Sequence, residues 1–345
     1  MLESIWFFLW MLLWAVYFAL DGFDLGIGML HPILCRTEED KRILYGAAGP
    51  FWDGNEVWLI AAGGVTFAAF PKAYAVMFSA LYVPLLALLF GLILRAVSYE
   101  FRNKVHHDLW IFFWDVVHFF ANLIPPLLLG VAFANLFMGI PIDADGVFHG
   151  TLMGLLNGYG IAGGIFFICL FLLHGALWLV IKSEGNLQIR ALTAANCLWV
   201  IVTIVLLVFL WMTATHTALW DNYLANLALL ILPLGALGAH FATPALLRAG
   251  KIWKAWGTNG LFIILVTFFG VSGLYPNLIL SSLDPKASVT IFNGASSELT
   301  LMIMLGVALV MVPIVIGYQV WMYRLFSHPI TEKDVQDEML EEFDH

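Results

Sequence analysis

The sequence predicts an all-α integral membrane protein with about nine transmembrane helices, its N-terminus periplasmic and its C-terminus cytoplasmic. Of its 345 residues, 62% are hydrophobic and 11% are charged, which is too little polar surface to cover a water-soluble globule of this size. Apolar windows of about 20 residues, long enough to cross a bilayer as a helix, recur along the chain. Lys and Arg gather in every second loop between these windows.

Charged gaps divide the apolar sequence into nine windows. The first is too long and too interrupted by carboxylates to be a cleavable signal, so we expect a retained helix. Many Trp residues fall near window ends, as interfacial anchors do. The windows are, in order, about 4–30, 46–70, 73–97, 108–137, 156–182, 191–213, 222–247, 255–276 and 298–325.

The charge alternation predicts the orientation, because positive residues concentrate in cytoplasmic loops. Of 15 Lys and Arg residues, only Lys72 and Lys286 fall on the side of the N-terminus. One span too few or too many would place the later basic loops on the wrong side, so the alternation also supports the count of nine. The other thirteen are Arg36, Lys41, Arg42, Arg95, Arg102, Lys104, Lys182, Arg190, Arg248, Lys251, Lys254, Arg324 and Lys333.

The chain divides into a polytopic helical domain over 1–326 and an acidic cytoplasmic tail over 327–345. The longest loops, near 138–155 and 277–297, have about 20 residues and leave no room for a large soluble domain. We therefore expect the function to reside in or between the helices. Membrane lipids are expected partners, and nucleic acid is not.

Four carboxylates lie in the first two windows. Asp21 and Asp24 are three residues apart, as are Asp53 and Glu56, and this spacing places each pair on one helix face. A charge near the bilayer centre costs about 2.5–3.5 kcal/mol or more, so such residues are functional candidates. At 1.5 Å per residue, Asp24 and Asp53 lie about 9–10 Å from the cytoplasmic ends of their helices.

These depths predict that Asp24 and Asp53 face each other across a polar seam that opens to the cytoplasm and passes protons. Gly22 and Gly26 form a small-xxx-small pair that lets another helix approach closely. The alternative is structural: helix-end carboxylates that pair with basic residues or hydrogen-bond across the helix interface. The basic residues available for such pairs are Arg36, Lys41 and Arg42.

A second polar stripe in the fourth window consists of Asp115, His118 and Asn122, which share a helix face. A structural role is its alternative. His118, His174 and His240 are deep enough to suggest a haem or metal ligand, but each is alone on its window. We expect interhelical hydrogen bonds instead, and no metal site. The three cysteines, without CxxC or Cys/His spacing, are Cys35, Cys169 and Cys197.

Two motifs, 21–29 (DGFDLGIGM) and 52–59 (WDGNEVWL), resemble the signatures of subunit II of the cytochrome bd-type quinol oxidases. Further segments at 95–102, 125–135 and 296–301 are similar to family segments in the same order. The resemblance covers essentially the full length. It is densest before residue 140 and weakest from about 150 to 290.

This resemblance implies a heterodimer in a bacterial inner membrane. The larger partner, subunit I, would carry the quinol site and the ligands of two haems b and one haem d, so this chain would ligate none. Together the subunits would oxidise quinol and reduce dioxygen to water with protons from the cytoplasm. The resemblance leaves open a structural quinone, to which no residue is assigned, and a small accessory single-helix subunit.

By motif position, Asp53 would be the proton-uptake carboxylate, with Trp52, Asn55 and Trp58 around it. Trp58 and its apolar surroundings would border a route for dioxygen. Two features depart from the family: Glu56 falls where an amide is also accepted, and His118 is outside the pattern. Two other functions stay open at this point, a proton-coupled secondary transporter and a purely structural subunit.

Overall fold

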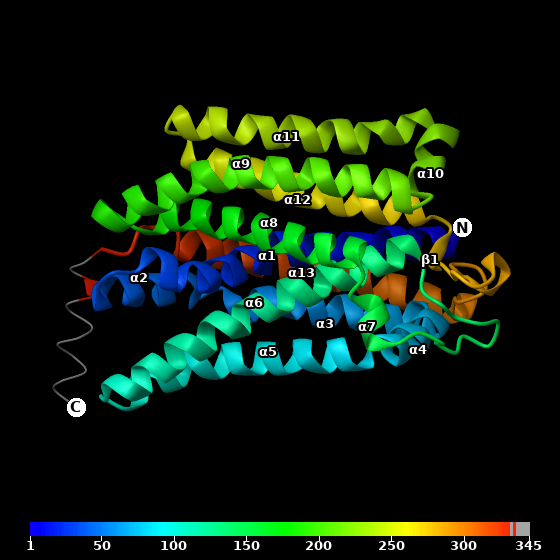
Figure 1. Ribbon diagram of the computed structural model, residues 1–345, viewed down its shortest axis with the longest axis horizontal. Helices are drawn as coiled ribbons and strands as arrows, with labels where there is room; N and C mark the ends of the chain where they lie inside the picture. Colours follow the sequence, from blue (N-terminus) through cyan, green and yellow to red (C-terminus); the bar gives the residue numbers. More distant parts are fainter. Residues whose placement is uncertain (332–333, 336–345) are drawn as a thin grey trace.

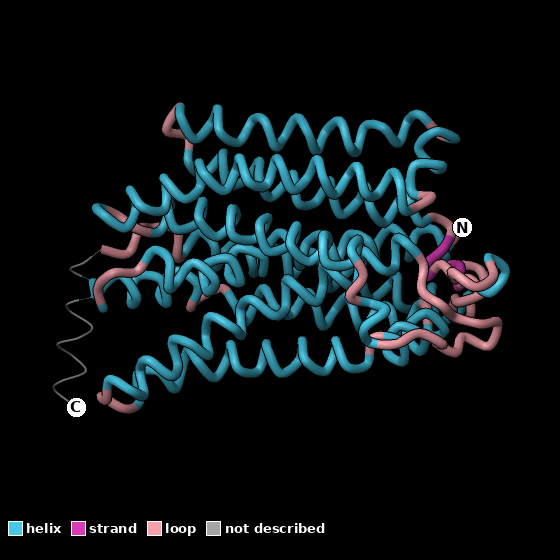
Figure 2. The backbone as a smooth tube through the Cα atoms, in the orientation of Figure 1, coloured by secondary structure: helices cyan, strands magenta, loops and turns pink. Residues whose placement is uncertain are grey.

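The computed structural model describes residues 1–331 and 334–335 of the chain as one helical bundle (Figures 1 and 2). The long helices run side by side along the long axis of the molecule. The N-terminus and the described C-terminal segment lie at opposite ends of this axis. The prediction for the tail over 327–345 falls mostly outside the described residues.

Within the described residues, eight helices are long and apolar enough to cross a membrane. This result confirms the predicted all-α membrane fold. The eight helices are α1 (Leu2–Leu34), α5 (Tyr82–Phe101), α6 (Asp108–Met138), α8 (Gly158–Lys182), α9 (Gly185–His216), α11 (Ile231–Arg248), α12 (Ile252–Leu274) and α13 (Glu298–Leu325).

The remaining predicted window, 46–70, folds as α3 (Trp52–Ala69). This helix is less apolar because it carries Asp53 and Glu56 in its first turns. It connects α2 (Glu38–Ala48), at the end of the bundle that holds the described C-terminal segment, to α4 (Pro71–Ala80) at the opposite end (Figure 1). It therefore passes through the bundle like the eight helices named above.

The predicted span at 73–97 is misplaced. The chain breaks at Leu81 between α4 and α5, and the crossing helix is α5. The apolar run from 71 to 101 contains no charged gap at the break, so the sequence pattern hid it. Pro84 lies in the first turn of α5, where proline is tolerated. As a result Arg95, assigned above to a cytoplasmic loop, lies inside α5 and is fully buried.

The connections contain only small elements. They are α7 (Leu152–Leu155), α10 (Leu219–Ala225), the 3₁₀ turns η1 (Arg102–Lys104), η2 (Leu227–Leu230) and η3 (Pro285–Ala287), and the strands β1 (Asn277–Ile279) and β2 (Val289–Thr290). The two strands pair antiparallel, with Asn277 opposite Thr290. They form a hairpin at the end of the bundle that holds the N-terminus (Figure 2).

Helix α1 lies at the centre of the bundle, and its close contact with α8 depends on glycine. A Cβ on Gly26 would collide with the Phe171 carbonyl, and a Cβ on Gly175 would collide with the backbone of Gly26. A Cβ on Gly22 would meet the Phe171 ring at 2.8 Å. These contacts confirm the predicted close approach at the small-xxx-small pair.

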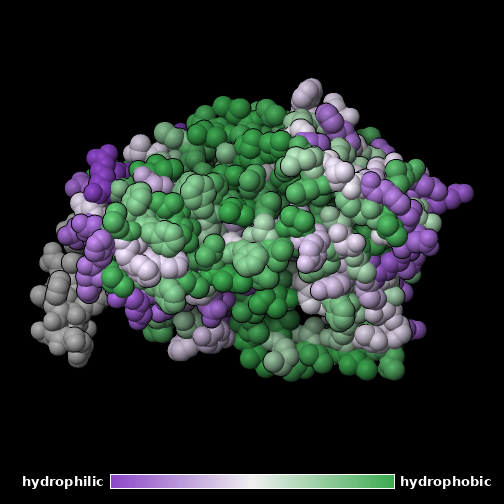
Figure 3. Space-filling view, turned by 60° about the horizontal axis from the view of Figure 1, so that its bottom comes forward, coloured by the Kyte–Doolittle hydropathy of each residue, from purple (hydrophilic) through white to green (hydrophobic). Residues whose placement is uncertain are grey.

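The outer surface has the pattern of a membrane protein. In Figure 3, apolar side chains cover the middle of the visible face, and polar side chains gather toward the two ends of the long axis. Helix α13 is the least covered of the long helices, with only 6% of its apolar window buried. An apolar face of this size suits lipid or another membrane protein.

Candidate functional site

A buried ion network joins three helices at the first pair of carboxylates. Arg95 of α5 donates from Nη1 to Asp21 Oδ1 of α1 at 2.8 Å and from Nη2 to Glu56 Oε2 of α3 at 2.6 Å. Arg95 and Asp21 are fully buried. A buried guanidinium is stable only when such charge-assisted bonds compensate its lost hydration. Arg95 lies at the edge of a predicted window, so its position in the sequence did not indicate a buried site.

Asp24 has an amide for its partner. Asn55 Nδ2 of α3 donates to Asp24 Oδ2 at 2.6 Å, and both side chains are fully buried. Asn55 Oδ1 in turn accepts hydrogen bonds from Gln319 Nε2 at 2.8 Å and from the Tyr323 hydroxyl at 3.1 Å, both on α13. Trp58 Nε1 donates to Gln319 Oε1 at 2.8 Å. Gln319 and Tyr323 extend this network to the outer face of the bundle.

Asp53 does not face Asp24, so this prediction is wrong. The side chain of Asp53 is exposed and makes no hydrogen bond or ion pair with the described residues. Residues 53 and 55 are separated by about 200° around a helix, so the rotation of α3 that points Asn55 at Asp24 points Asp53 outward. Trp52 stacks on Tyr99 of α5 with a ring-centroid distance of 5.4 Å.

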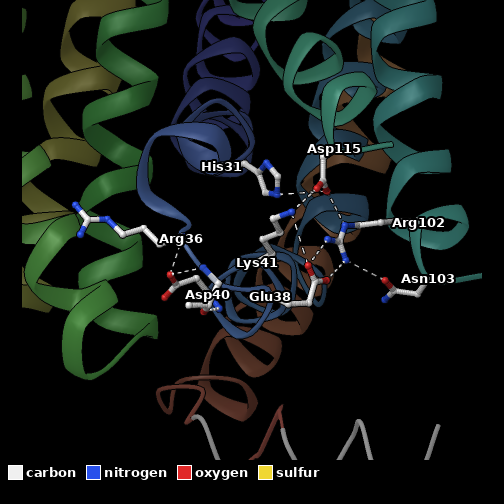
Figure 4. Close-up of polar contacts among 9 residues, drawn as sticks. His31, Arg36, Glu38, Asp40, Lys41, Arg102, Asn103 and Asp115 are labelled. Carbon is white, nitrogen blue, oxygen red and sulfur yellow. Dashed lines mark hydrogen bonds and ion pairs between the residues drawn. The ribbon is translucent and has the colours of Figure 1, made fainter. Parts of the chain in front are cut away.

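A second charged cluster, the Asp115 cluster, lies at the end of the bundle that holds α2 (Figure 4). Asp115 of α6 accepts hydrogen bonds from Lys41 Nζ and Arg102 Nε, each at 2.6 Å. His31 Nε2 lies 3.4 Å from Asp115 Oδ1, and Arg102 Nη1 lies 2.7 Å from Glu38 Oε1. Lys41 therefore pairs with the second polar stripe and not with the carboxylates of the first motif.

The rest of the second polar stripe is buried next to this cluster. His118 is fully buried, with Nδ1 2.7 Å from Ser98 Oγ. Asn122 Nδ2 donates to the His118 carbonyl at 2.7 Å. The His118 ring packs on Tyr45 of α2 with a centroid distance of 4.5 Å, and burial raises the pKa of the Tyr45 phenol well above its usual value.

The other two deep histidines hydrogen-bond between helices, as predicted. His174 contacts the Ala19 carbonyl through Nε2 at 2.9 Å and Asn259 Nδ2 through Nδ1 at 3.0 Å. His240 Nε2 lies 2.8 Å from Thr203 Oγ1. Among the described residues, no three His, Cys, Asp or Glu side chains are grouped so that they could hold a metal ion.

An apolar groove of about 820 Å³ lies beside Trp58. Side chains of α1, α3, α12 and α13 line it, among them Leu13, Val57, Trp256 and Val312. Gln319 and Arg324 bring polar atoms to its wall. An apolar groove of this kind admits nonpolar molecules and lipid chains in preference to water.

The family model described as cytochrome bd terminal oxidase subunit II matches residues 2–326. Cytochrome bd ubiquinol oxidase subunit 2 of Bacillus subtilis is 37% identical over 336 residues, which cover 96% of this chain and 98% of that protein. Cytochrome bd-I ubiquinol oxidase subunit 2 of Escherichia coli K12 is 31% identical over 365 residues, which cover 95% and 96% of the two chains.

The fold is similar to that of a solved structure, the bd oxidase from Geobacillus thermodenitrificans. The TM-score is 0.75 at 19% sequence identity, and the match covers 94% of this chain and 98% of that one. At this identity the match supports the fold alone.

Proposed function

This chain belongs to the family of subunit II of the cytochrome bd terminal oxidases, and from this premise we propose that it takes up protons for the reduction of dioxygen by a complex with subunit I. It is a multi-pass protein of the bacterial inner membrane and part of a respiratory quinol oxidase that works with haem. In the proposed reaction, quinol is oxidised and dioxygen is reduced to water.

The exposed carboxylate of Asp53 is the observation that carries this proposal. It lies in the first turn of a helix that passes through the bundle, without a partner among the described residues. A carboxylate that faces lipid costs about 2.5–3.5 kcal/mol or more, whereas one at a protein or water interface does not. We infer that subunit I covers this face and that Asp53 hands protons to it.

Helix α3, beside the exposed α13, carries four residues of the second motif: Trp52, Asp53, Asn55 and Trp58. In our proposal Asp21, Asp24 and Glu56 form the inner part of the proton path, and Asn55 links Asp24 to the outer face. Trp58 and the groove beside it border the approach of dioxygen, which dissolves well in apolar surroundings.

We place the two haems b, the haem d and the quinol site on subunit I. In this chain both ring nitrogens of His174 are hydrogen-bonded, and no described histidine lines the groove. These residues do not fit a haem, so no step of the reaction is assigned to a haem here. A structural quinone and a small accessory single-helix subunit remain proposals without assigned residues.

The basic residues support an orientation in which the C-terminal end of the bundle is cytoplasmic and the N-terminus is periplasmic. Buried Arg95 no longer counts as a loop charge, and Lys333 lies outside the described residues. Eleven of the thirteen predicted basic residues then remain at the C-terminal end. Lys72 and Lys286 lie at the other end, so the basic residues are still concentrated at the C-terminal end without Arg95 and Lys333.

The test is Asp53→Asn in the purified complex with subunit I. We expect the variant to assemble with an unchanged haem spectrum but to consume oxygen more slowly with reduced quinol, because an amide cannot carry a proton to its partner. Asp53→Glu should retain most of the rate. Asp145→Asn, an exposed carboxylate in the loop before α7, is the matched control.

Wild-type turnover in an assembled, haem-replete Asp53→Asn complex would refute the assignment. A purified protein without haem bands or oxygen uptake would instead favour the proton-coupled transporter. Preserved oxygen uptake after removal of all the intramembrane carboxylates would favour a purely structural subunit.

A further inference from the structure

One face of α1 carries polar side chains along most of its length. Five buried polar residues follow one another at spacings of three or four residues, with one step of seven before the last. They are Trp14, Tyr17, Asp21, Asp24 and His31. This spacing aligns them as one stripe, which extends about 25 Å at 1.5 Å per residue. Three of them have only weak partners: Tyr17 Oη and the Asp21 carboxylate lie beside each other, and His31 Nε2 reaches only Asp115 Oδ1, at 3.4 Å. Trp14 Nε1 and Asp24 Oδ1 have no hydrogen-bond partner among the described residues.

The helices opposite the stripe present further atoms of this kind: Tyr45 Oη, Tyr99 Oη, His118 Nε2 and Asn122 Oδ1. The His118 ring lies within 6.0 Å of the His31 ring, centroid to centroid, and closer to both tyrosines. Asn122 packs directly against Gly28, where the stripe has its seven-residue step. The two sets of atoms therefore face one seam along the part of the stripe from His31 to Asp24.

A buried polar group without a partner costs about 1–3 kcal/mol. Six groups of the two sets have no partner at all among the described residues, which would cost as much as the whole stability of an ordinary protein. Proteins satisfy such groups with ordered water that makes about three hydrogen bonds. We propose that this seam holds a file of water and that His31 and His118 pass protons along it from the Asp115 cluster to Asp24. This second proton entrance does not use Asp53, and its role in catalysis rests on the proposed function.

The contacts of His118 suit a relay. The Ser98 hydroxyl donates to the Arg95 carbonyl at 2.6 Å, so His118 Nδ1 carries the hydrogen and donates to Ser98 Oγ. Nε2 is left with a free lone pair toward the seam. The proton therefore enters and leaves through Nε2, from one seam water to the next, while the Nδ1 hydrogen stays in its bond to Ser98.

Arg95 explains why a polar stripe of this length need not leak protons through the whole membrane. Its guanidinium is bound to Asp21, the next stripe residue after Asp24 on the way toward the N-terminus. The guanidinium has no lone pair that could accept a proton, and it donates to both Asp21 and Glu56, so it interrupts the row of proton acceptors. The path therefore carries protons from His31 to Asp24 and stops there.

Hydroxyl-radical footprinting of the intact complex tests for the water itself, because radicals formed from bound water oxidise buried side chains beside it. Tyr17, Tyr159 and Tyr223 are all fully buried. The hydroxyls of the last two are bonded to Thr213 and to the Phe269 carbonyl, whereas the Tyr17 hydroxyl lies on the stripe beside Asp21 without such a bond. We expect Tyr17 to be oxidised faster than both. Equal, slow oxidation of the three would overturn the proposal whatever the enzyme's activity.

Proton transfer is tested with His118→Phe alone and combined with Asp53→Asn. We expect the double variant to reduce oxygen about tenfold or more slowly than Asp53→Asn, with a larger solvent deuterium isotope effect. His240→Phe, which removes a buried hydrogen-bonded histidine elsewhere, is the control and should add no loss. Ser98→Ala should act in the same direction as His118→Phe if the latter assembles poorly.

Equal rates for His118→Phe and His240→Phe in both backgrounds would refute the second entrance and leave the role of Asp53 standing. A wild-type complex without quinol-driven oxygen uptake would refute the proposed function and the catalytic part of this inference together. The oxidation of Tyr17 would still decide whether the water file exists.

Discussion

At the scale of single residues, Arg95 sets the electrostatics of the site. It is one buried cation with Asp21 and Glu56 as partners, while Asp24 has only the neutral amide of Asn55. Three carboxyl groups around one guanidinium cannot all be charged without a large desolvation cost. Asp24 is therefore the member of this group that is suited to hold a transferable proton.

Arg95→Gln should lower the free energy of unfolding by about 3–5 kcal/mol, because it leaves the fully buried Asp21 without its counter-charge. Thermal melting of the purified complex measures this loss. Arg95→Gln combined with Asp21→Asn should recover part of it, and Lys104→Gln, at an exposed cation, should melt like the wild type. Unchanged melting of Arg95→Gln would contradict the ion network.

His174→Ala should leave the haem spectrum of the complex unchanged, because both of its ring nitrogens are already hydrogen-bonded within this chain. His118→Ala should do the same. Absorbance spectra of the purified variants check this prediction. Loss of one haem from either variant would show that this chain ligates it.

At the scale of elements, hydropathy and charge gaps predicted most of the helices but not the break at Leu81, which has no charge to mark it. The same gap rule placed Arg95 in a loop. Depth along a helix follows from residue counting, whereas the direction of a side chain depends on helix rotation. For this reason the sequence did not predict the contact of Asp24 with Asn55. The predicted depth of about 9–10 Å is also wrong, because Asp53 lies in the first turn of α3 and α1 continues for ten residues past Asp24.

Gly26→Ala should destabilise the contact between α1 and α8 by about 1–3 kcal/mol, because its Cβ would collide with backbone atoms that cannot move aside. Gly257→Ala in α12 is the control, since a Cβ there meets nothing within 4 Å. Thermal melting of the two variants compares them directly. Equal midpoints would contradict the close packing of α1 on α8.

At the scale of the whole molecule, the resemblance of its motifs predicted a partner subunit, but only the structure indicates a face for it. Three features on or beside α3 indicate it: the exposed Asp53, the groove beside Trp58 and the nearly uncovered α13. Helices α11 and α13 are both exposed and have no charged side chain in their apolar stretches. What distinguishes the α13 side is the exposed Asp53 of the neighbouring α3. The distribution of polar groups distinguishes a protein-facing surface from a lipid-facing one.

A photo-crosslinking amino acid at Ile314 of α13 should capture subunit I, whereas the same group at Leu234 of α11 should capture lipid. The two side chains are similarly exposed in this chain, at 60% and 65%, so accessibility does not favour either. Gel analysis of the irradiated complex reads the result. Capture of subunit I from Leu234 and not from Ile314 would place the interface on the other side of the bundle.

The central claim is that this chain takes up protons at its C-terminal end. The most direct measurement uses the complex in liposomes, fully reduced, with a pH dye confined to one side when oxygen is admitted. We predict rapid proton uptake from the side of the C-terminus, slowed by Asp53→Asn and not by Asp145→Asn. Uptake from the side of the N-terminus, or uptake at the wild-type rate in Asp53→Asn, would contradict the account.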